Sequence, residues 1–336
     1  MQILLTGSSG VVGSYVLGYL LEQGHDVIAV DRIPLTEKTL SELSSIYPDI
    51  SSGTSERLKQ HIIELTSIED VKDLFNQYKG SINGVIHLAA IPDPLKFDAR
   101  FTHNSNVNAS FNVLYTAAEN GIQRITQASS VNFTGLSYTR KDKQIFDKVP
   151  ITEDEPSHTE DPYGLSKVIC EMQATVICRL FPVRIASLRF HHVLPTLSEA
   201  EKYARYVELW AWTSSLSAAQ ACLQGITSEG WQGHEPFNIV APEIAWKRGI
   251  SEESNHNNSD KNDNRKNQQG QSQGQSQGES ESGCESELNT LDLLDMDKRW
   301  NGRIGQIDHD WWIDNKRNGF WDCTKANKLL GWQHNV

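Results

Sequence analysis

The chain opens with a short apolar run, a glycine-rich loop and a helical segment, in that order. Residues 2–6 form the apolar run, and the loop carries the spacing Gly-x-x-Gly-x-x-Gly at Gly7, Gly10 and Gly13. Residues 11–23 follow with apolar side chains at helical spacing, and Gly24 ends the pattern. A strand, a glycine turn and a helix in direct succession are typical of parallel α/β folds that bind nucleotides.

Strand and helix patterns continue to alternate up to about residue 190. The further expected strands are 27–30, 61–65, 84–90, 124–130 and 183–190, and the further expected helices are 68–78, 107–120 and 163–180. This alternation predicts an α/β fold, a doubly wound parallel sheet of the Rossmann-like type with helices on both faces. We expect residues 1–190 to form the nucleotide-binding domain. Residues 191–336 are expected to form a small C-terminal substrate-binding part, with some elements returning to the main sheet.

Residues 251–286 have a different composition from the rest of the chain. They consist mainly of Asn, Gln, Ser, Gly and Glu, and Cys284 is their only apolar side chain. Such a segment buries too little apolar surface to offset an ordering entropy of roughly 1–2 kcal/mol per residue. We expect a disordered low-complexity insert, with a docking or phosphorylation segment as the alternative.

Composition argues against several classes of function. The formal net charge of -12 disfavours a nucleic-acid partner. No apolar run approaches the ~18 residues that a membrane span needs. The five cysteines are scattered without metal-ligand spacing, which favours free thiols and predicts no metal. Because no signal-peptide pattern precedes residues 2–6, we expect a cytoplasmic protein.

The glycine loop has the properties that a pyrophosphate site requires. Gly7 permits a tight turn, Gly10 lets the backbone approach the phosphates, and Gly13 lets the helix pack closely against the strand. We assign the pyrophosphate to Gly7, Gly10, Val11, Val12 and Gly13.

Asp31 follows the second expected strand, 18 residues after Gly13. A carboxylate at this position accepts hydrogen bonds from the adenosine ribose hydroxyls and repels a 2′-phosphate, which favours NAD over NADP. Arg32 argues in the opposite direction, since an arginine pairs with that phosphate. We expect NAD, with NADP less favoured. The other residues expected around the cofactor lie at strand ends: Glu64, Leu65, Leu88, Ala89, Ala90 and Phe190.

Tyr163 and Lys167 are spaced i, i+4 and therefore share one helix face. A phenol with a pKa near ~10 is a poor base, but a neighbouring ammonium and an oxidised nicotinamide would favour the phenolate. Lowering that pKa by ~3 units corresponds to ~4 kcal/mol. Tyr163 would then exchange a substrate proton during hydride transfer, while Lys167 also holds the nicotinamide ribose. Ser130, at the end of the fifth expected strand, would bond the same substrate oxygen.

These motifs resemble the extended short-chain dehydrogenase/reductase family, in particular its NAD-dependent epimerase/dehydratase group. The resemblance covers residues 1 to about 195 and returns at 231–241 and 320–332. It rests on Thr6-Gly7-x-x-Gly10-x-x-Gly13, His87-Leu88-Ala89-Ala90, Asn106-Val107-x-Ala109-Ser110, Ser129-Ser130 and Asp161-Pro162-Tyr163-x-x-x-Lys167. It implies that Ser130, Tyr163 and Lys167 are the catalytic triad and that Asn106 is a structural or active-site asparagine beside the cofactor. It also implies a homodimer formed through helices.

The resemblance implies a small sugar-like substrate whose secondary alcohol is oxidised, in an epimerase, dehydratase or dehydrogenase. Many family members that act on sugar nucleotides have an asparagine after an arginine and an aromatic residue; here Arg189-Phe190 is followed by His191-His192. This departure leaves a uronate- or aldose-type dehydrogenase acting on a free sugar as an alternative, and one of the two histidines would then line the substrate cleft. A non-catalytic NAD-binding regulatory protein is the third hypothesis.

Overall fold

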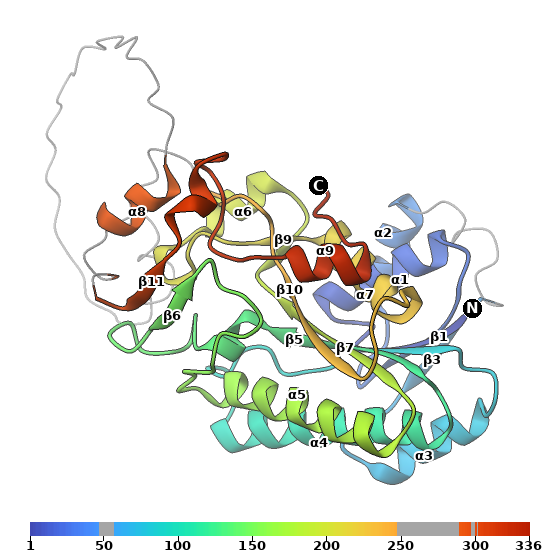
Figure 1. Ribbon diagram of the computed structural model, residues 1–336. Coiled ribbons are helices and arrows are strands. Elements are labelled where there is room, and N and C mark those ends of the chain that lie inside the picture. The colour runs from blue at the N-terminus through green and yellow to red at the C-terminus, as the bar shows by residue number, and fades with distance from the viewer. Residues whose placement is uncertain (47–56, 247–288, 297–299, 301) are drawn as a thin grey trace, which may run out of the picture.

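The computed structural model describes residues 1–46, 57–246, 289–296, 300 and 302–336. A parallel sheet of seven strands lies at its centre (Figure 1). The strands are β1 (Gln2–Thr6), β2 (Asp26–Asp31), β3 (Leu58–Ile62), β4 (Gly84–His87), β5 (Arg124–Ser130), β7 (Arg184–Phe190) and β10 (His234–Ile239). Their order across the sheet is β10-β7-β5-β4-β1-β2-β3. The expected doubly wound α/β fold is confirmed.

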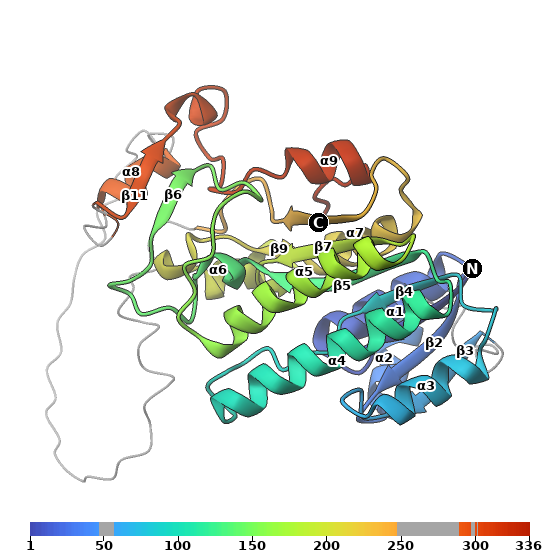
Figure 2. The same ribbon diagram turned by 60° about the horizontal axis from the view of Figure 1, so that its bottom comes forward.

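Helices cover both faces of this sheet (Figure 2). One face carries α1 (Val11–Glu22), α7 (Ser215–Thr227) and α9 (Thr324–Leu330), and the other carries α3 (Ile68–Gln77), α4 (Ala99–Glu119) and α5 (Pro162–Leu180). Within β1, Ile3 and Leu5 belong to the core under α1 and α7, whereas Leu4 belongs to the core under α3, α4 and α5. Because both faces are buried, the strand is continuously apolar instead of alternating.

Three expected boundaries differ from the structure. The third strand spans 58–62 instead of 61–65, because it pairs with β2 only as far as Asp31 and Ile62. It lies at the edge of the sheet and has exposed positions, so its apolar signal was weak. The fourth strand ends at His87, before Ala90. The helix expected over 107–120 starts already at Ala99, where the Asp98 side chain accepts the Arg100 and Phe101 amides as an N-cap.

A second apolar core lies beside the sheet. It combines buried residues from 131–151, 207–211, 240–244 and 293–321, among them Leu136, Phe146, Trp210 and Phe320. The smaller elements here are β6 (Phe146–Val149), β8 (Val193–Leu194), β9 (Thr213–Ser214), β11 (Ile304–Ile307), η2 (Val131–Thr134), α6 (Leu197–Tyr203), η3 (Tyr206–Glu208), α8 (Thr290–Met296) and η7 (His309–Trp312). β6 pairs with β11, and β8 pairs with β9. α2 (Glu37–Ile46) lies next to α1.

Sequence order and spatial order differ at the predicted domain boundary. The segment 131–151 packs in the second core, although it precedes residue 190. β10 comes after residue 190 and is the last strand at one edge of the main sheet, and α7, which also follows residue 190, packs against this sheet. The division at residue 190 stays a prediction. The predicted insert 251–286 lies outside the described residues.

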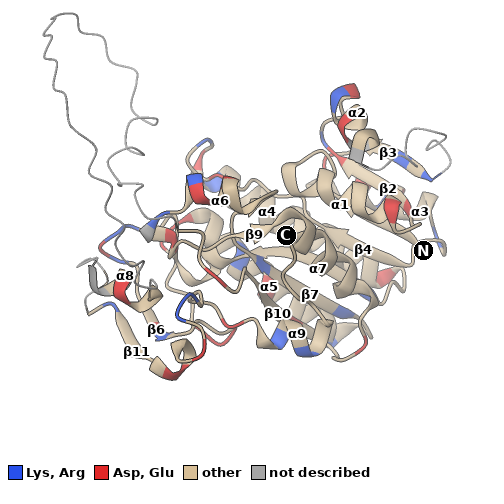
Figure 3. Cartoon of the chain, turned by 90° about the horizontal axis from the view of Figure 1, so that it is seen from above, with Lys and Arg blue, Asp and Glu red and all other residues tan. Residues whose placement is uncertain are grey.

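Acidic and basic residues are interspersed along the described elements of the chain (Figure 3). None of the described helices combines the length and the apolar character that crossing a bilayer requires. The cytoplasmic location stays a prediction.

Candidate active site

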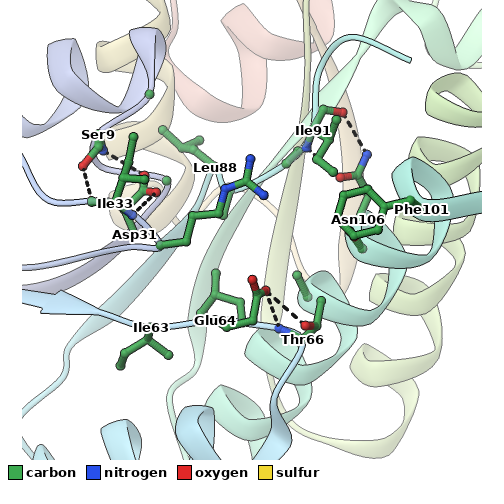
Figure 4. Close-up of a pocket in the computed structure, with 18 residues that line it drawn as sticks. Ser9, Asp31, Ile33, Ile63, Glu64, Thr66, Leu88, Ile91, Phe101 and Asn106 are labelled. Carbon is green, nitrogen blue, oxygen red and sulfur yellow. Dashed lines mark hydrogen bonds between the residues drawn. The ribbon is translucent and has the colours of Figure 1, made fainter. Parts of the chain in front are cut away.

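A pocket of about 260 Å³ opens at the carboxyl ends of β1 to β4 (Figure 4). We call it the glycine-loop pocket. Its lining is Gly7, Ser9, Gly10, Asp31, Arg32, Ile33, Ile63, Glu64, Leu65, Thr66, Leu88, Ala89, Ala90, Ile91, Phe101, Ser105, Asn106 and Ala109. It therefore gathers most of the predicted cofactor residues at the carboxyl edge of the sheet, where ligands of doubly wound folds bind.

At two positions of the glycine loop, the backbone leaves room for no residue other than glycine. Gly7 has φ +73°, and a Cβ there would lie 2.6 Å from the Ala89 nitrogen. A Cβ at Gly13 would lie 1.9 Å from the Gly7 carbonyl oxygen. Gly10 is the N-cap of α1 and provides no side-chain cap, so the first amides of the helix remain available to an anion. Val11, Val12 and Gly13 lie in this first turn, outside the pocket lining.

The Asp31 carboxylate is held in place by two backbone amides. Its Oδ2 accepts the Ser9 N–H at 3.0 Å, and its Oδ1 accepts the Ile33 N–H at 3.3 Å. The Ser9 hydroxyl donates to the Ile33 carbonyl at 2.9 Å, which closes the loop around the carboxylate. Each oxygen retains a lone pair for a further donor. Ser9 and Ile33 were missed by sequence reasoning because their contacts depend on how the two loops meet. Arg32 is exposed at the pocket wall.

Glu64 and Leu65 lie in the loop after β3, since that strand ends at Ile62. The Glu64 carboxylate accepts the Thr66 amide at 3.2 Å and the Thr66 hydroxyl at 3.1 Å. Glu64 therefore shapes the turn at the pocket wall instead of ending a strand. Leu88, Ala89 and Ala90 likewise lie in a loop, after β4.

Asn106 lines the pocket from α4, but its side-chain amide is occupied by protein groups. The Oδ1 atom accepts the Ile91 N–H at 2.7 Å, and the Nδ2 atom donates to the Ile91 carbonyl at 3.1 Å. Nδ2 also donates to the Ser166 hydroxyl at 3.1 Å. Asn106 thus anchors the loop after β4 to α5, which supports a structural role.

Ser130, Tyr163 and Lys167 are brought together at the end of β5 and the start of α5. Asp161 caps α5 by accepting the Gly164 amide at 2.7 Å, and Pro162 occupies its first turn. The Ser130 side chain lies close enough to the Tyr163 phenol to lower its pKa by hydrogen bonding. The Lys167 Nζ atom lies 5.5 Å from the centroid of the Tyr163 ring and donates to the Ala128 carbonyl at 2.7 Å.

All three of these side chains are buried, and none lines the glycine-loop pocket. They are connected to it through Ser166, whose hydroxyl receives the Asn106 amide and donates to the Tyr163 carbonyl at 2.7 Å. Phe190, on β7, lies opposite Ser130 in the strand pairing. The predicted site thus separates into a pocket and an adjacent buried cluster.

Burial sets the protonation of the Tyr163–Lys167 pair. It raises the pKa of the Tyr163 phenol to about 12, although the hydrogen bond from Ser130 acts in the opposite direction. Burial also lowers the pKa of the Lys167 ammonium. Both changes have the same cause, since a water-poor site penalises the charged form of either group. Desolvation is the largest effect on the Tyr163 pKa in the protein alone, and the lowering expected from Lys167 together with an oxidised nicotinamide stays a prediction.

The two histidines after β7 occupy different environments. His191 is buried, with a ring nitrogen 3.1 Å from the Glu208 carbonyl and its ring against Trp321, and burial lowers its pKa to about 3. Its ring lies outside the lining of the glycine-loop pocket, and the lining of a substrate cleft by one of the two histidines stays a prediction. His192 is half-exposed, and its Nδ1 atom lies 3.6 Å from the Glu208 carboxylate.

Away from the glycine-loop pocket, His158 Nε2 lies 3.3 Å from Asp147 and 4.0 Å from Glu155. One ligand atom from each of these three side chains lies within 4.8 Å of the others. That the chain uses no metal stays a prediction.

The model of the NAD dependent epimerase/dehydratase family matches residues 3–210. The chain belongs to this family. It is similar to UDP-glucose 4-epimerases of Corynebacterium glutamicum (28% identity over 199 residues, 57% of this chain and 51% of that protein) and Neisseria gonorrhoeae (25% over 190 residues, 54% and 50%). The family member described here thus spans about half the length of these curated relatives.

Solved structures share the fold over a larger part of the chain. A UDP-glucose 4-epimerase of Thermotoga maritima with UDP-glucose superimposes with a TM-score of 0.61 at 17% identity, covering 100% of this chain and 94% of that one. A UDP-glucose 4-epimerase of Bifidobacterium longum with NAD+ and UDP gives 0.62 at 16% identity, covering 100% and 94%. A mutated uronate dehydrogenase gives 0.52 at 20% identity, covering 71% and 74%. At these identities, the likeness concerns the fold.

Proposed function

We propose that this chain is an NAD-dependent oxidoreductase or epimerase that acts on a secondary alcohol of a sugar or sugar nucleotide. The observation that carries the proposal is the buried cluster of Ser130, Tyr163 and Lys167 beside the glycine-loop pocket. Membership of the NAD dependent epimerase/dehydratase family and the NAD in related folds support the cofactor. NADP is less favoured, because it would place a phosphate beside Asp31.

The residues of the pocket fit a dinucleotide. The amides at the uncapped start of α1 would hold the pyrophosphate, and the close approach at Gly7 and Gly13 leaves no room for side chains there. Asp31 would accept the adenosine ribose hydroxyls. Bound NAD would supply the hydride acceptor and a positively charged nicotinamide. Together with the Lys167 ammonium, that charge would favour the phenolate of Tyr163 despite its raised pKa.

Tyr163, Ser130 and Lys167 would each have a different role in the transfer of the substrate proton. Tyr163 takes the proton of the substrate hydroxyl as the hydride leaves the same carbon, and Ser130 holds the substrate oxygen through its hydroxyl. Lys167, held by the Ala128 carbonyl, stays close to the Tyr163 ring and would hold the nicotinamide ribose. An epimerase returns the hydride to the other face of the same intermediate, whereas a dehydrogenase releases NADH.

A free uronate or aldose is the second candidate substrate. The residue after Arg189-Phe190 is His191, whose ring lies in the core and offers no side-chain donor to a diphosphate. The names of the curated relatives favour a nucleotide sugar, whereas this burial favours a smaller substrate. A regulatory NAD-binding protein is disfavoured, since Tyr163 and Lys167 are both retained and lie close together.

The proposal is tested by incubating the purified chain with NAD and a panel of nucleotide sugars, uronates and aldoses. NADH formation indicates a dehydrogenase, and an altered sugar without net NADH indicates an epimerase. Tyr163→Phe should reduce turnover by about 10³-fold or more and leave NAD affinity within a few-fold, because it removes only the proton-transfer group. Tyr115→Phe is the control on α4. Normal turnover by Tyr163→Phe contradicts the mechanism, and NAD binding without turnover on any sugar favours the regulatory protein.

We also propose a homodimer through α4 and α5, which run side by side on the outside of the sheet (Figures 1 and 2). Apolar side chains are exposed along both helices: Phe101, Phe111, Leu165, Met172, Val176 and Leu180. A contiguous apolar helix face is typical of a protein interface. Met172→Lys combined with Val176→Lys should give monomers in sedimentation experiments, while Leu95→Lys, outside the two helices, should not. An unchanged mass for the double variant contradicts this interface.

A further inference from the structure

Glu171 is a fully buried carboxylate in the middle of α5, one helical turn after Lys167. Its Oε1 atom accepts the Ser129 hydroxyl at 2.6 Å and the Arg189 Nε at 3.0 Å, and its Oε2 atom accepts the Arg189 Nη2 at 2.8 Å. Both members of the ion pair are almost completely shielded from solvent, with 3% and 6% of the side chains exposed. A buried ion pair is weak evidence for a contribution to stability, because desolvation opposes the attraction.

The contacts of Glu171 join the catalytic helix to two strands of the sheet. Ser129 is the neighbour of Ser130 on β5, and Arg189 lies opposite Ser129 on β7. Arg189 also donates to the Glu153 carbonyl at 3.0 Å and lies 3.7 Å from the centroid of the Phe133 ring. The helix that carries Tyr163 and Lys167 is thus fixed to the strand that carries Ser130 by a charged hydrogen-bond network directly behind the three side chains.

The ionisable groups around Lys167 come from four elements. On α5 itself are Tyr163, Cys170 and Glu171, of which Cys170 and Glu171 raise the pKa of Lys167 against the lowering effect of burial. On β4, His87 is buried with a pKa of about 3 and stays neutral. β5 contributes the neutral acceptor Ala128 and the neutral hydroxyls of Ser129 and Ser130. On β7, Arg189 is positive and is neutralised by Glu171.

We propose that Glu171 is a positioning residue of the hydride-transfer site, which keeps Lys167 in its ammonium form and fixes the catalytic helix against β5. This role rests on the proposed function, in which Lys167 binds the nicotinamide ribose. Without the Glu171 charge, two positive groups, Arg189 and Lys167, would share a water-poor region. Without the Arg189 charge, Lys167 would face an uncompensated carboxylate.

Removing the Glu171 charge and removing the Arg189 charge should shift the protonation of Lys167 in opposite directions. A purely structural role of the ion pair predicts no such opposite effects. Glu171→Gln removes the negative charge and favours the neutral amine of Lys167, so NAD affinity should fall at a lower pH than in the wild type. Arg189→Gln leaves the negative charge and favours the ammonium, so the same fall should occur at a higher pH. A purely structural network would weaken both variants in the same direction, because each leaves a buried partner unpaired.

The experiment is calorimetric titration with NAD between pH 6 and pH 10. The midpoint of the alkaline loss of affinity should move down by about 1 pH unit in Glu171→Gln and up by about 1 pH unit in Arg189→Gln. Glu171→Asp should retain a midpoint close to that of the wild type. Glu229→Gln, which breaks the exposed ion pair between Arg124 and Glu229, is the matched control and should leave the midpoint unchanged.

The variant with both changes, Glu171→Gln and Arg189→Gln, covers the case in which a single variant fails to fold. It contains no unpaired buried charge from this ion pair, and its midpoint should lie below that of the wild type, since Glu171 is among the groups that raise the pKa of Lys167 and lies one helical turn away on the same helix. The inference is overturned if the wild type and this double variant have equal midpoints. It is also overturned if the midpoints of both single variants shift in the same direction. Either result leaves the proposed function intact. A wild-type chain that binds no NAD at any of these pH values overturns both.

Discussion

The Asn106 side-chain amide donates to the Ser166 hydroxyl at 3.1 Å, and this bond joins the wall of the glycine-loop pocket to the helix of Tyr163 and Lys167. Asn106 contacts α5 while holding both backbone polar groups of Ile91. Any change in the loop after β4 is therefore transmitted to the first turn of α5.

Asn106→Ala should lower the free energy of unfolding by about 1–3 kcal/mol, because it leaves the buried polar groups of Ile91 and Ser166 without partners. Urea denaturation measures the change. Asn120→Ala, which loses one partly buried bond at the end of α4, should cost less. Equal losses in the two variants would show that Asn106 is not a special anchor.

Gly13→Ala should abolish NAD binding, since a Cβ there would lie 1.9 Å from the Gly7 carbonyl oxygen and displace the loop. The measurement is the dissociation constant for NAD together with the thermal midpoint. Gly24→Ala is the control: its φ of +79° is strained, but nothing lies within 4 Å of the added atom. It should cost about 1 kcal/mol in stability and leave NAD affinity unchanged. Tight NAD binding by Gly13→Ala would exclude the glycine loop as the pyrophosphate site.

Asp31→Asn should reduce the preference for NAD over NADP by about 10-fold or more, because a repulsion worth about 1.4 kcal/mol between the carboxylate and a 2′-phosphate disappears. The ratio of the two dissociation constants is the measurement. Asp26→Asn, at the opposite end of β2 from the pocket, should leave the ratio unchanged. A ratio that stays constant in Asp31→Asn would place the adenosine ribose elsewhere.

Acid should destabilise the protein partly through His191. Its pKa falls from 6.5 to about 3 on burial, so the folded state keeps this ring neutral. The unfolded chain binds the proton first, and the resulting stability is present above pH 6.5 and lost as the pH falls toward 3. At pH 5, His191→Gln should reduce the pH slope of the unfolding free energy by about 1.4 kcal/mol per pH unit. An unchanged slope in His191→Gln would contradict a neutral buried ring.

The main sheet could be predicted from sequence because its strands have continuous apolar runs and its loops contain diagnostic glycines. β1 is buried on both faces and β3 is not, so the first was found with correct bounds and the second was misplaced by three residues. β6 and β11 were not foreseen, since each has only four residues and they pair across a separation of more than 150 positions.

Within the candidate site, residue types were predictable and their surroundings were not. Gly7, Asp31 and Asn106 all reached the pocket that their motifs indicated. The direction in which the Tyr163 pKa shifts depends on how completely the phenol is buried. The i, i+4 spacing to Lys167 contains no information on this burial. The burial of His191 could not be predicted for a related reason, because its ring packs against Trp321 of the second apolar core, which the local sequence does not reveal.

The second core has a consequence for how this molecule can be divided. Val131, Leu136, Phe146 and Val149 are connected by sequence to β5 and α5, yet their apolar partners come from beyond residue 200. A fragment cut at residue 190 would keep the glycine loop but would expose these side chains directly after Ser130. We therefore expect that residues 1–190 do not fold stably without the later segments that cover these side chains.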